Sequence, residues 1–393
     1  MSIDLVVRNA SRLLTCSSAH GEGRLGVIER GALAASGGTI TWIGVERDLP
    51  AHEGARIIDA AGGAVLPGLI DPHTHLIWAG DRADEFVARI AGDIYTGGGI
   101  ARTVAATSAA GDEELRALAT ARLDRFAAFG VTTIEAKSGY GLTREQERRL
   151  VELGATIQHP VTRVVPTFLG AHVIPSGTTP DEAERTVIDM IPDVASQARF
   201  IDAWCEQGAF DVAACERILR AGAAAGMQTK LHAEQLSRSG GAQLAARIGC
   251  RSVDHLEHAT EEDARALAAA GVVAVLMPGA SMMTGQPFAP ARTLIDAGVT
   301  VALSTDCNPG SSYSENLPLQ VSLACTQLGM TLEEAILGVT AHAAAATDLV
   351  GSGALIPGAV ADLVILGAPH EAELAYHYGA SLIAQVIAAR PGS

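Results

Sequence analysis

Two histidines, His73 and His75, stand one residue apart at the end of the apolar segment LPGLIDPHTH. Because side chains alternate between the two faces of a strand, residues separated by one position point the same way. Two imidazoles directed to one point are suited to bind one divalent metal ion. On this spacing alone the alternative is an ordinary exposed pair at a strand end, since short motifs also arise by chance.

Further polar side chains follow other apolar segments of the chain. They are His172 in TRVVPTFLGAH, His232 in QTKLHAE, His255 and His258 in RSVDHLEH, and Asp306 in TVALSTDCN. Three imidazoles and one carboxylate form a suitable site for a borderline divalent ion, with a position left for water. Such an ion lowers the pKa of bound water toward about 7, so hydroxide is available at neutral pH.

Asp306 and His255 are the candidates for proton transfer. We expect Asp306 to accept a proton from the attacking water, and His255 to polarise a substrate carbonyl or carry a proton to the leaving nitrogen. The alternative role for Asp306 is a helix N-cap before the NPGSS turn. Six other histidines are expected at ordinary surface or core positions: His20, His52, His159, His258, His342 and His370.

The segments that carry these residues belong to a regular alternation of strands and helices. Eight apolar runs, typical of parallel strands buried on both faces, lie within residues 69–75, 131–139, 162–172, 199–206, 228–234, 251–258, 272–280 and 300–308. Helical patterns between them end at Gly130, Gly226 and Gly271, which suits the left-handed C′ position. These units predict an α/β fold, a (β/α)8 TIM-type barrel, whose active site lies at the carboxyl ends of the strands. A doubly wound sheet is the alternative, but its usual glycine-rich turn does not follow the first strand.

The two ends of the chain have a different pattern. Short strand-like runs separated by turns occupy residues 1–65 and 351–393. We expect both termini to build one small β-sandwich domain, with a barrel of residues 66–350 inserted between its halves.

Composition excludes several classes of partner. The chain has 393 residues, 48% of them hydrophobic and 18% charged, as in a globular protein with a large core. A formal net charge of −16 argues against a nucleic-acid partner and against an anionic membrane surface. An anionic substrate would have to be bound by a few local cations. The start, MSIDLVVRNA, has no signal-peptide pattern, and six scattered cysteines without a CxxC pair indicate reduced thiols in the cytoplasm.

Several segments together resemble a known enzyme family. PGLIDPHTH, LHAEQ, DHLEH and STDCNPG are similar to the amidohydrolase superfamily. AGDR, GGGI, KSGYGL, TFLGAH, TDCNPGSS and ELAYHYG narrow the resemblance to its imidazolonepropionase family and span nearly the whole chain. The resemblance implies hydrolysis of the ring amide of 4-imidazolone-5-propanoate to N-formimidoyl-L-glutamate in histidine degradation. It also implies one zinc or iron ion per subunit, and a homodimer is the assembly that we consider.

The resemblance assigns roles to residues one by one. The metal ligands fall on His73, His75, His232 and Asp306, and the second catalytic histidine falls on His255. The substrate contacts fall on Arg82, Tyr95, Tyr140, His172, Gln235, Asn308, Gly310 and Ser311. Arg82 has the planar fork that a carboxylate needs, although it could instead pair with Asp81 or Asp84 on the surface. Tyr140 stands between glycines, which allow a close approach to a ligand, or it could simply pack.

Three features differ from the family pattern or need comment. The segment between Arg89 and Gly97 is short, and Gln235 stands where some members carry Glu. Because Gln is not a base, that role passes to Asp306, His255 or Glu234. Lys137 resembles the carbamylated lysine of two-metal relatives, but this family uses one metal, so we expect a surface or ion-pairing role.

Two other functions remain open from the sequence. One is another cyclic-amide hydrolase or a purine or pyrimidine deaminase with the same metal set, although a neutral base would not need Arg82. The other is an inactive scaffold of this fold, although such proteins lose metal ligands and none is missing here.

Overall fold

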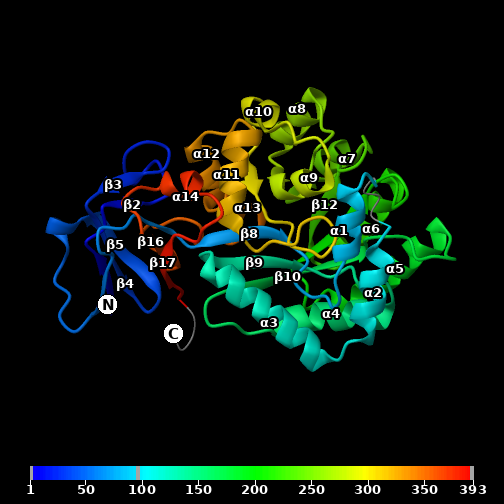
Figure 1. Ribbon diagram of the computed structural model, residues 1–393, viewed down its shortest axis with the longest axis horizontal. Coiled ribbons are helices and arrows are strands. Elements are labelled where there is room, and N and C mark those ends of the chain that lie inside the picture. The colour runs from blue at the N-terminus through cyan, green and yellow to red at the C-terminus, as the bar shows by residue number, and fades with distance from the viewer. Residues whose placement is uncertain (1–2, 94–97, 390–393) are drawn as a thin grey trace.

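The computed structural model describes residues 3–93 and 98–389 of the chain (Figure 1). Its centre is an eight-stranded sheet in which each strand pairs in parallel with the next one along the chain. The strands are β8 (Leu69–Thr74), β9 (Val131–Lys137), β10 (Arg163–Ala171), β11 (Phe200–Cys205), β12 (Gln228–Ala233), β13 (Ser252–His255), β14 (Val273–Leu276) and β15 (Val301–Leu303). The eight predicted barrel strands are therefore confirmed.

The last barrel strand returns to the first. Thr74 forms a parallel bridge with Cys307, and the backbone N–H of His75 donates to the carbonyl of Cys307 at 3.0 Å. This contact nearly closes the sheet into the (β/α)8 barrel that the sequence predicts. It also brings the residues that follow β15 next to the histidines of β8.

Helices surround the barrel strands (Figure 1). They are α1 (Ala83–Ile90), α2 (Ile100–Ala109), α3 (Asp112–Ala128), α4 (Arg144–Thr156), α5 (Pro180–Val194), α6 (Val212–Ala224), α7 (Gly241–Ile248), α8 (Glu261–Ala270), α9 (Pro278–Thr284), α10 (Ala291–Asp296), α11 (Leu317–Gln327), α12 (Leu332–Gly338), α13 (Ala341–Ala346) and α14 (Glu373–Tyr376). Three of them, α5, α8 and α12, begin with a threonine capping box. Gly130, Gly226 and Gly271 all have positive φ after α3, α6 and α8, as predicted.

Two further sheets lie at one end of the molecule (Figure 1). The first contains β1 (Leu5–Arg8), β4 (Gly31–Ser36), β5 (Thr39–Val45) and β6 (Arg56–Asp59), with the short 3-10 helix η1 (Glu46–Asp48) after β5. The second contains β2 (Arg12–Leu14), β3 (Val27–Glu29), β7 (Val65–Pro67), β16 (Leu363–Leu366) and β17 (Ile383–Ile387). Apolar residues of both sheets, among them Leu33, Ile58, Val65 and Leu363, form one hydrophobic cluster.

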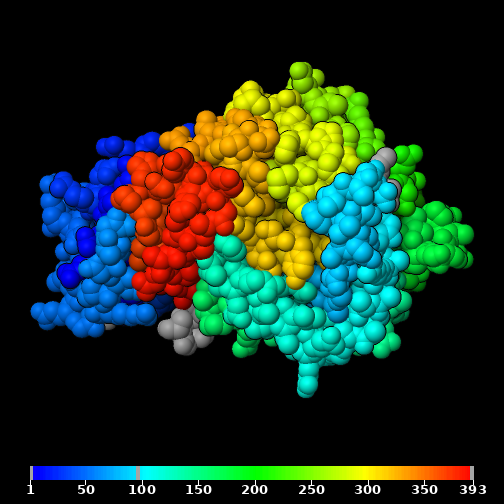
Figure 2. Space-filling model, viewed as in Figure 1, coloured from blue at the N-terminus to red at the C-terminus, as the bar shows by residue number. Residues whose placement is uncertain are grey.

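The C-terminal strands are thus paired with N-terminal ones. In the second sheet β16 pairs antiparallel with β7, which runs almost directly into β8. On the surface the C-terminal segment lies between the N-terminal strands and the barrel (Figure 2). The division of the chain into domains at residues 65/66 and 350/351 stays a prediction. Within the described residues, no helix is long and apolar enough to cross a membrane.

Candidate active site

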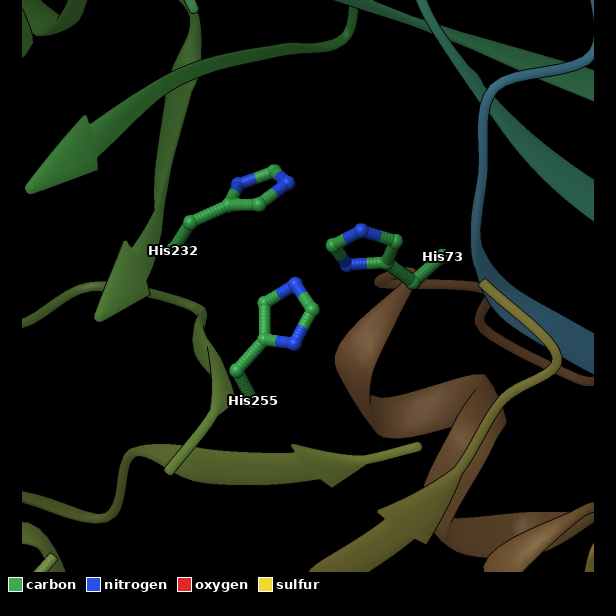
Figure 3. Close-up of side chains that lie close together, drawn as sticks. All are labelled: His73, His232 and His255. Atoms are coloured by element: carbon green, nitrogen blue, oxygen red, sulfur yellow. The ribbon is translucent and has the colours of Figure 1, made fainter. Parts of the chain in front are cut away.

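The polar residues predicted from the strand ends meet at one end of the barrel. His73, His232 and His255 come from β8, β12 and β13 and direct their rings to a common space (Figure 3). The side chain of His75 also reaches this space, as does that of Asp306, three residues after β15. All five residues are at most 3% exposed.

The distances between these side chains are those of a site that one ion could join. Nε2 of His73 lies 3.5 Å from Oδ1 of Asp306, and Nε2 of His75 lies 3.8 Å from the same oxygen. One possible ligand atom each from His73, His75 and Asp306 lies within 4.8 Å of the others. The same holds for the group of His73, His232 and His255. The two groups share His73, so the geometry brings the predicted ligands together and places His255 beside them.

Several imidazole nitrogens of the site have no hydrogen-bond partner among the described residues. Nε2 of His73, Nδ1 of His75 and both ring nitrogens of His232 are buried in this way. Buried polar atoms are rarely left unpaired unless an ion, water or ligand meets them. Imidazole and carboxylate together suit zinc or iron, so the residues present fit the ion that the sequence implies.

Aspartates behind the site orient two of the histidines. Nδ1 of His73 forms a hydrogen bond of 2.6 Å with Oδ2 of Asp254. Nδ1 of His232 lies 2.9 Å from Oδ2 of Asp202, a close contact without hydrogen-bond geometry. A carboxylate at Nδ1 favours the tautomer that carries its hydrogen there, and the lone pair of Nε2 is then directed into the site. This arrangement is typical of metal-binding histidines.

Burial keeps the three histidines neutral. It lowers the pKa of His73, His75 and His232 well below its ordinary value, and neighbouring cationic groups add to the effect. A neutral imidazole is the form that binds a metal ion.

Asp306 and His255 have the opposite tendencies. Burial raises the pKa of Asp306 to about 6, although His255 and Ser311 oppose the shift. For His255, burial lowers the pKa, but Glu257, with Oε1 at 3.6 Å from Nδ1, and Asp306 outweigh it, so its pKa is raised. The raised pKa of Asp306 favours uptake of a proton and that of His255 favours retention of one, as suits proton-transfer groups.

The backbone is strained where these side chains leave the strands. Glu234, His255, Leu256 and Asp306 have φ of 56°, 84°, 69° and 52°, the left-handed region that non-glycine residues rarely adopt. Each such residue costs on the order of 1–3 kcal/mol and persists only where the surroundings enforce it. The strain coincides with the ends of β12 and β13 and with the loop after β15. It turns the chain sharply at the edge of the pocket.

A small pocket opens in front of the candidate ligands. It is lined by His75, Arg82, Ile100, Tyr140, His172, Trp204, His232, Gln235, His255, Asp306, Asn308 and Ser311. Most predicted substrate contacts are in this list. Ile100 and Trp204 are not predicted from the sequence, although Trp204 lies near the carboxyl end of β11 and the strand-end rule could have found it.

Arg82 lies inside the protein, beside this pocket. Its side chain is 2% exposed, and its Nη2 lies 2.6 Å from Oε2 of Glu85. The expected alternative, a surface pair with Asp81 or Asp84, is therefore wrong in both partner and location. Gly310 lies against the guanidinium of Arg82, since a Cβ at this position would lie 2.1 Å from Nη1 of Arg82. Gly310 thus leaves the space that the guanidinium occupies.

Tyr140 and His172 form one side of the pocket. Nδ1 of His172 donates to the carbonyl of Gly139 at 2.9 Å, and burial lowers the pKa of His172 to about 4. Gly139 has φ of 100°, and a Cβ there would lie 2.8 Å from that nitrogen. Glu147 accepts from the backbone N–H groups of Gly139, Gly141 and Leu142, which holds the loop that carries Tyr140.

Asn308 and Ser311 shape the loop after β15. The amide of Asn308 donates to the carbonyl of Asp306 and to Ser311, and its oxygen accepts from the N–H groups of Gly310 and Ser311. Ser311 donates to Oδ2 of Asp306 at 2.8 Å. Because these bonds use the capacity of the Asn308 amide, its main effect is to fix Asp306. The next helix, α11, has Asn316 as its N-cap, so the N-cap alternative for Asp306 is wrong.

The other residues considered from the sequence are Gln235, Glu234, Tyr95 and the histidines expected outside the site. Gln235 lines the pocket, whereas Glu234 accepts from the backbone of Ser239, Gly240 and Ala242, as a loop-forming group does. Tyr95 lies outside the described residues. Of the residues described, the pocket lining includes none of the histidines expected elsewhere, namely His20, His52, His159, His258, His342 and His370.

Comparison with known proteins gives the family. The profile of the amidohydrolase family matches residues 88–373. An imidazolonepropionase of Salinispora arenicola is 47% identical over 98% of this chain and 97% of its own length. One of Haloarcula marismortui is 43% identical over 98% of this chain and 95% of its own length.

The chain belongs to the imidazolonepropionases of the amidohydrolase family.

Solved structures of other enzymes share the fold. An adenosine deaminase of Xanthomonas campestris with bound zinc has a TM-score of 0.75 over 99% of this chain and 92% of its own, at 18% identity. An N-isopropylammelide isopropylaminohydrolase of Burkholderia multivorans has a TM-score of 0.72 over 99% of this chain and 97% of its own, at 19% identity. At such identities the likeness supports the amidohydrolase barrel alone.

Lys137 differs from its expected surface position. Its side chain is 0% exposed, with Nζ 2.9 Å from Glu135 and 2.7 Å from Asp202. The ion-pairing role is confirmed and the surface role is wrong. In this amidohydrolase barrel the acids around Lys137 were missed from the sequence. The feature of the sequence that could have indicated them is an acidic residue within an otherwise apolar strand, as in TTIEAK and RFIDAWC.

Proposed function

We propose that the chain hydrolyses the ring amide of 4-imidazolone-5-propanoate and releases N-formimidoyl-L-glutamate. The observation that carries the proposal is the pairing, in one buried pocket, of a histidine–aspartate cluster with the guanidinium of Arg82. The cluster suits amide hydrolysis, and the guanidinium suits the propanoate of the substrate. Relatives named imidazolonepropionase over nearly the full chain support the same reaction.

One zinc or iron ion per subunit belongs to this proposal. His73, His75, His232 and Asp306 would hold it, because their buried ligand atoms converge on one space. When bound, a divalent ion supplies Lewis acidity and makes a hydroxide nucleophile available at neutral pH.

Asp306 and His255 would move the protons of the reaction. Asp306 accepts a proton from the attacking water, whose oxygen forms a bond to the ring carbonyl carbon. His255 polarises that carbonyl or delivers a proton to the ring nitrogen as the carbon–nitrogen bond breaks. The raised pKa of His255 supports its role as a proton donor near neutral pH.

The remaining pocket residues would bind and orient the substrate. Arg82 binds the propanoate, while Tyr140, His172 and Gln235 line the space for the ring. Gly310 provides room for Arg82, and Asn308 and Ser311 keep Asp306 in place. Tyr95 remains a predicted substrate contact. A purine or pyrimidine base has no carboxylate for Arg82, so a deaminase is the less suitable alternative.

The compartment and the assembly are also proposed. All six cysteines are free, which suits an enzyme of the reducing cytoplasm. A homodimer without a nucleic-acid or membrane partner stays a prediction.

The test is an assay of imidazolone hydrolysis by the purified chain, with a neutral nucleobase as the comparison substrate. Loss of the imidazolone ring with formation of N-formimidoyl-L-glutamate supports the proposal. Turnover of the nucleobase alone would replace it with deamination.

A further inference from the structure

Five ionisable side chains lie fully buried in the barrel, behind the candidate ligands. They are Glu135, Lys137, Asp202, Lys230 and Asp254, each with a side chain 0% exposed. A barrel interior is usually filled with branched apolar residues, and an unpaired buried charge is very costly. The three acids and two lysines satisfy one another, so the contacts of each lysine indicate what it supports.

The two lysines share Glu135 but differ in their contacts with the aspartates. Nζ of Lys137 lies 2.7 Å from Oδ2 of Asp202 and 3.3 Å from Oδ2 of Asp254, in addition to its contact with Glu135. Nζ of Lys230 donates to Glu135 and, at 2.9 Å, to the carbonyl of Pro72. It lies 4.0 Å from Asp254. Only Lys137, of the two, is within hydrogen-bond distance of an aspartate that faces a candidate ligand.

The oxygens that Lys137 contacts are those that face the histidines. Oδ2 of Asp254 lies 2.6 Å from Nδ1 of His73, and Oδ2 of Asp202 lies 2.9 Å from Nδ1 of His232. One ammonium group therefore joins the two carboxylates that lie against two imidazoles on different strands. Carboxylates behind ligand histidines fix the orientation and tautomer of the ring.

We propose that Lys137 is a positioning residue for the metal centre, because it holds Asp202 and Asp254 in place and through them orients His232 and His73. The inference rests on the ligand assignment proposed above. Without the ammonium group, the two buried carboxylates would lose the cation that lies between them, and only Lys230, 4.0 Å from Asp254, would remain as a more distant counter-charge. The imidazoles would then lose the contacts that direct Nε2 toward the ion. Among the described residues the hydrogen bonds of Lys137 go to Glu135 and Asp202, so its effect is expected first in metal affinity.

The experiment compares Lys137→Met with Lys230→Met. Methionine has a similar length and stays buried, so each variant removes one ammonium group from the same network. Zinc affinity is measured on chelator-stripped protein by competition with a chromophoric chelator. Lys137→Met is expected to weaken zinc binding about 10- to 100-fold, the usual effect of losing support behind a ligand. Lys230→Met is expected to change it by less than about threefold on the same argument.

The variant His232→Ala tests the ligand assignment independently of the role of Lys137. This variant must lose zinc binding if the assignment is right, and retention of zinc there would show that the ligand set itself is wrong. With His232→Ala behaving as expected, unchanged affinity in Lys137→Met would overturn the role of Lys137. Equal weakening in both lysine variants would overturn it too, because a general disturbance of the core would then explain the loss.

If a single lysine variant does not fold, two charge-balanced double variants test the same proposal. Glu135→Gln/Lys137→Met and Glu135→Gln/Lys230→Met each remove one negative and one positive charge from the network. The first is expected to bind zinc about 10- to 100-fold more weakly than Glu135→Gln alone, and the second to match it within about threefold. Circular dichroism checks that all variants are folded. The same affinity in both double variants would contradict the proposal.

Discussion

Arg82 donates two hydrogen bonds to one carboxylate oxygen of Glu85, from Nε at 2.9 Å and from Nη2 at 2.6 Å. The arginine is buried beside the pocket, whereas the side chain of Glu85 is 29% exposed. A carboxylate of the protein thus already occupies part of the fork that the propanoate of the substrate would use. This relationship makes the recognition of an anionic substrate testable at both partners.

Arg82→Lys should weaken transition-state binding of the propanoate substrate. Lysine keeps the positive charge but loses the two-pronged geometry, and a charge-assisted bond contributes about 1–3 kcal/mol. We expect kcat/KM for 4-imidazolone-5-propanoate to fall by the corresponding factor of about 5 to 150. Unchanged KM and kcat/KM would show that Arg82 does not contact the substrate.

Glu85→Gln should have the opposite effect on KM. The neutral amide competes less strongly for the guanidinium, since hydrogen bonds between charged partners are roughly twice as strong as neutral ones. We expect a lower KM for the imidazolone, with kcat nearly unchanged, in steady-state kinetics. A raised KM would contradict this expectation and would mean that Glu85 orients Arg82 for binding.

His255→Ala should separate proton transfer from metal binding. His255 is proposed to act on the substrate and not as a ligand, so the variant should keep its metal while kcat falls about 10²- to 10⁴-fold. KM should change far less, because Arg82, Tyr140 and His172 remain. Loss of the metal from His255→Ala would instead show that this histidine is a ligand. Its position would allow this, because His255 belongs to one of the two groups of possible ligands, together with His73 and His232.

His255→Gln distinguishes two forms of that role. Glutamine donates a hydrogen bond but carries no proton to the leaving nitrogen. Low turnover in both variants is the expected result, and near-normal turnover in His255→Gln would leave only polarisation of the carbonyl.

Glu334, which is not among the residues that line the pocket, allows a prediction about how stability depends on pH. Burial opposes its ionisation, but hydrogen bonds from Arg292, the N–H of Thr331 and Arg24 lower its pKa to about 2. The pKa in the unfolded chain is about 4.3. Because the folded-state pKa is the lower one, the carboxylate stabilises the fold above about pH 4.3, and this stabilisation is lost as pH falls toward 2.

Glu334→Gln should therefore be less stable than the wild type at pH 7, and the difference should narrow below about pH 4.3. Glutamine still suits the capping box at Thr331, so the charge is the main change. Urea denaturation of the metal-free proteins at several pH values measures the difference. A gap that stays constant from pH 7 to pH 3 would contradict the assignment.

The sequence predicts the barrel and its polar edge well, for a physical reason. A strand buried on both faces must be apolar along its length, so His73, His232 and Asp306 stand out at the points where strands end. The rule that parallel strands present their carboxyl ends together then places them in one site. Helix ends at Gly130, Gly226 and Gly271 follow from the same local chemistry.

The network behind the site is not predictable in this way. Lys137 and Asp202 are charges within apolar strands, and one sequence does not tell whether such a residue points outward or into the barrel. Their burial depends on partners more than 60 residues away, such as the contact between Lys137 and Asp202. The contacts of Asn308 likewise depend on the conformation of the loop after β15.

The most direct test of the central claim measures metal content and imidazolone hydrolysis on the same preparation. The account predicts one equivalent of zinc or iron per chain, loss of 4-imidazolone-5-propanoate hydrolysis when a chelator removes it, and recovery when the metal is returned. His232→Ala should fold normally by circular dichroism, hold little metal and hydrolyse little substrate. Two equivalents of metal, hydrolysis that survives metal removal, or a metal-loaded wild-type chain that leaves the imidazolone intact would contradict it.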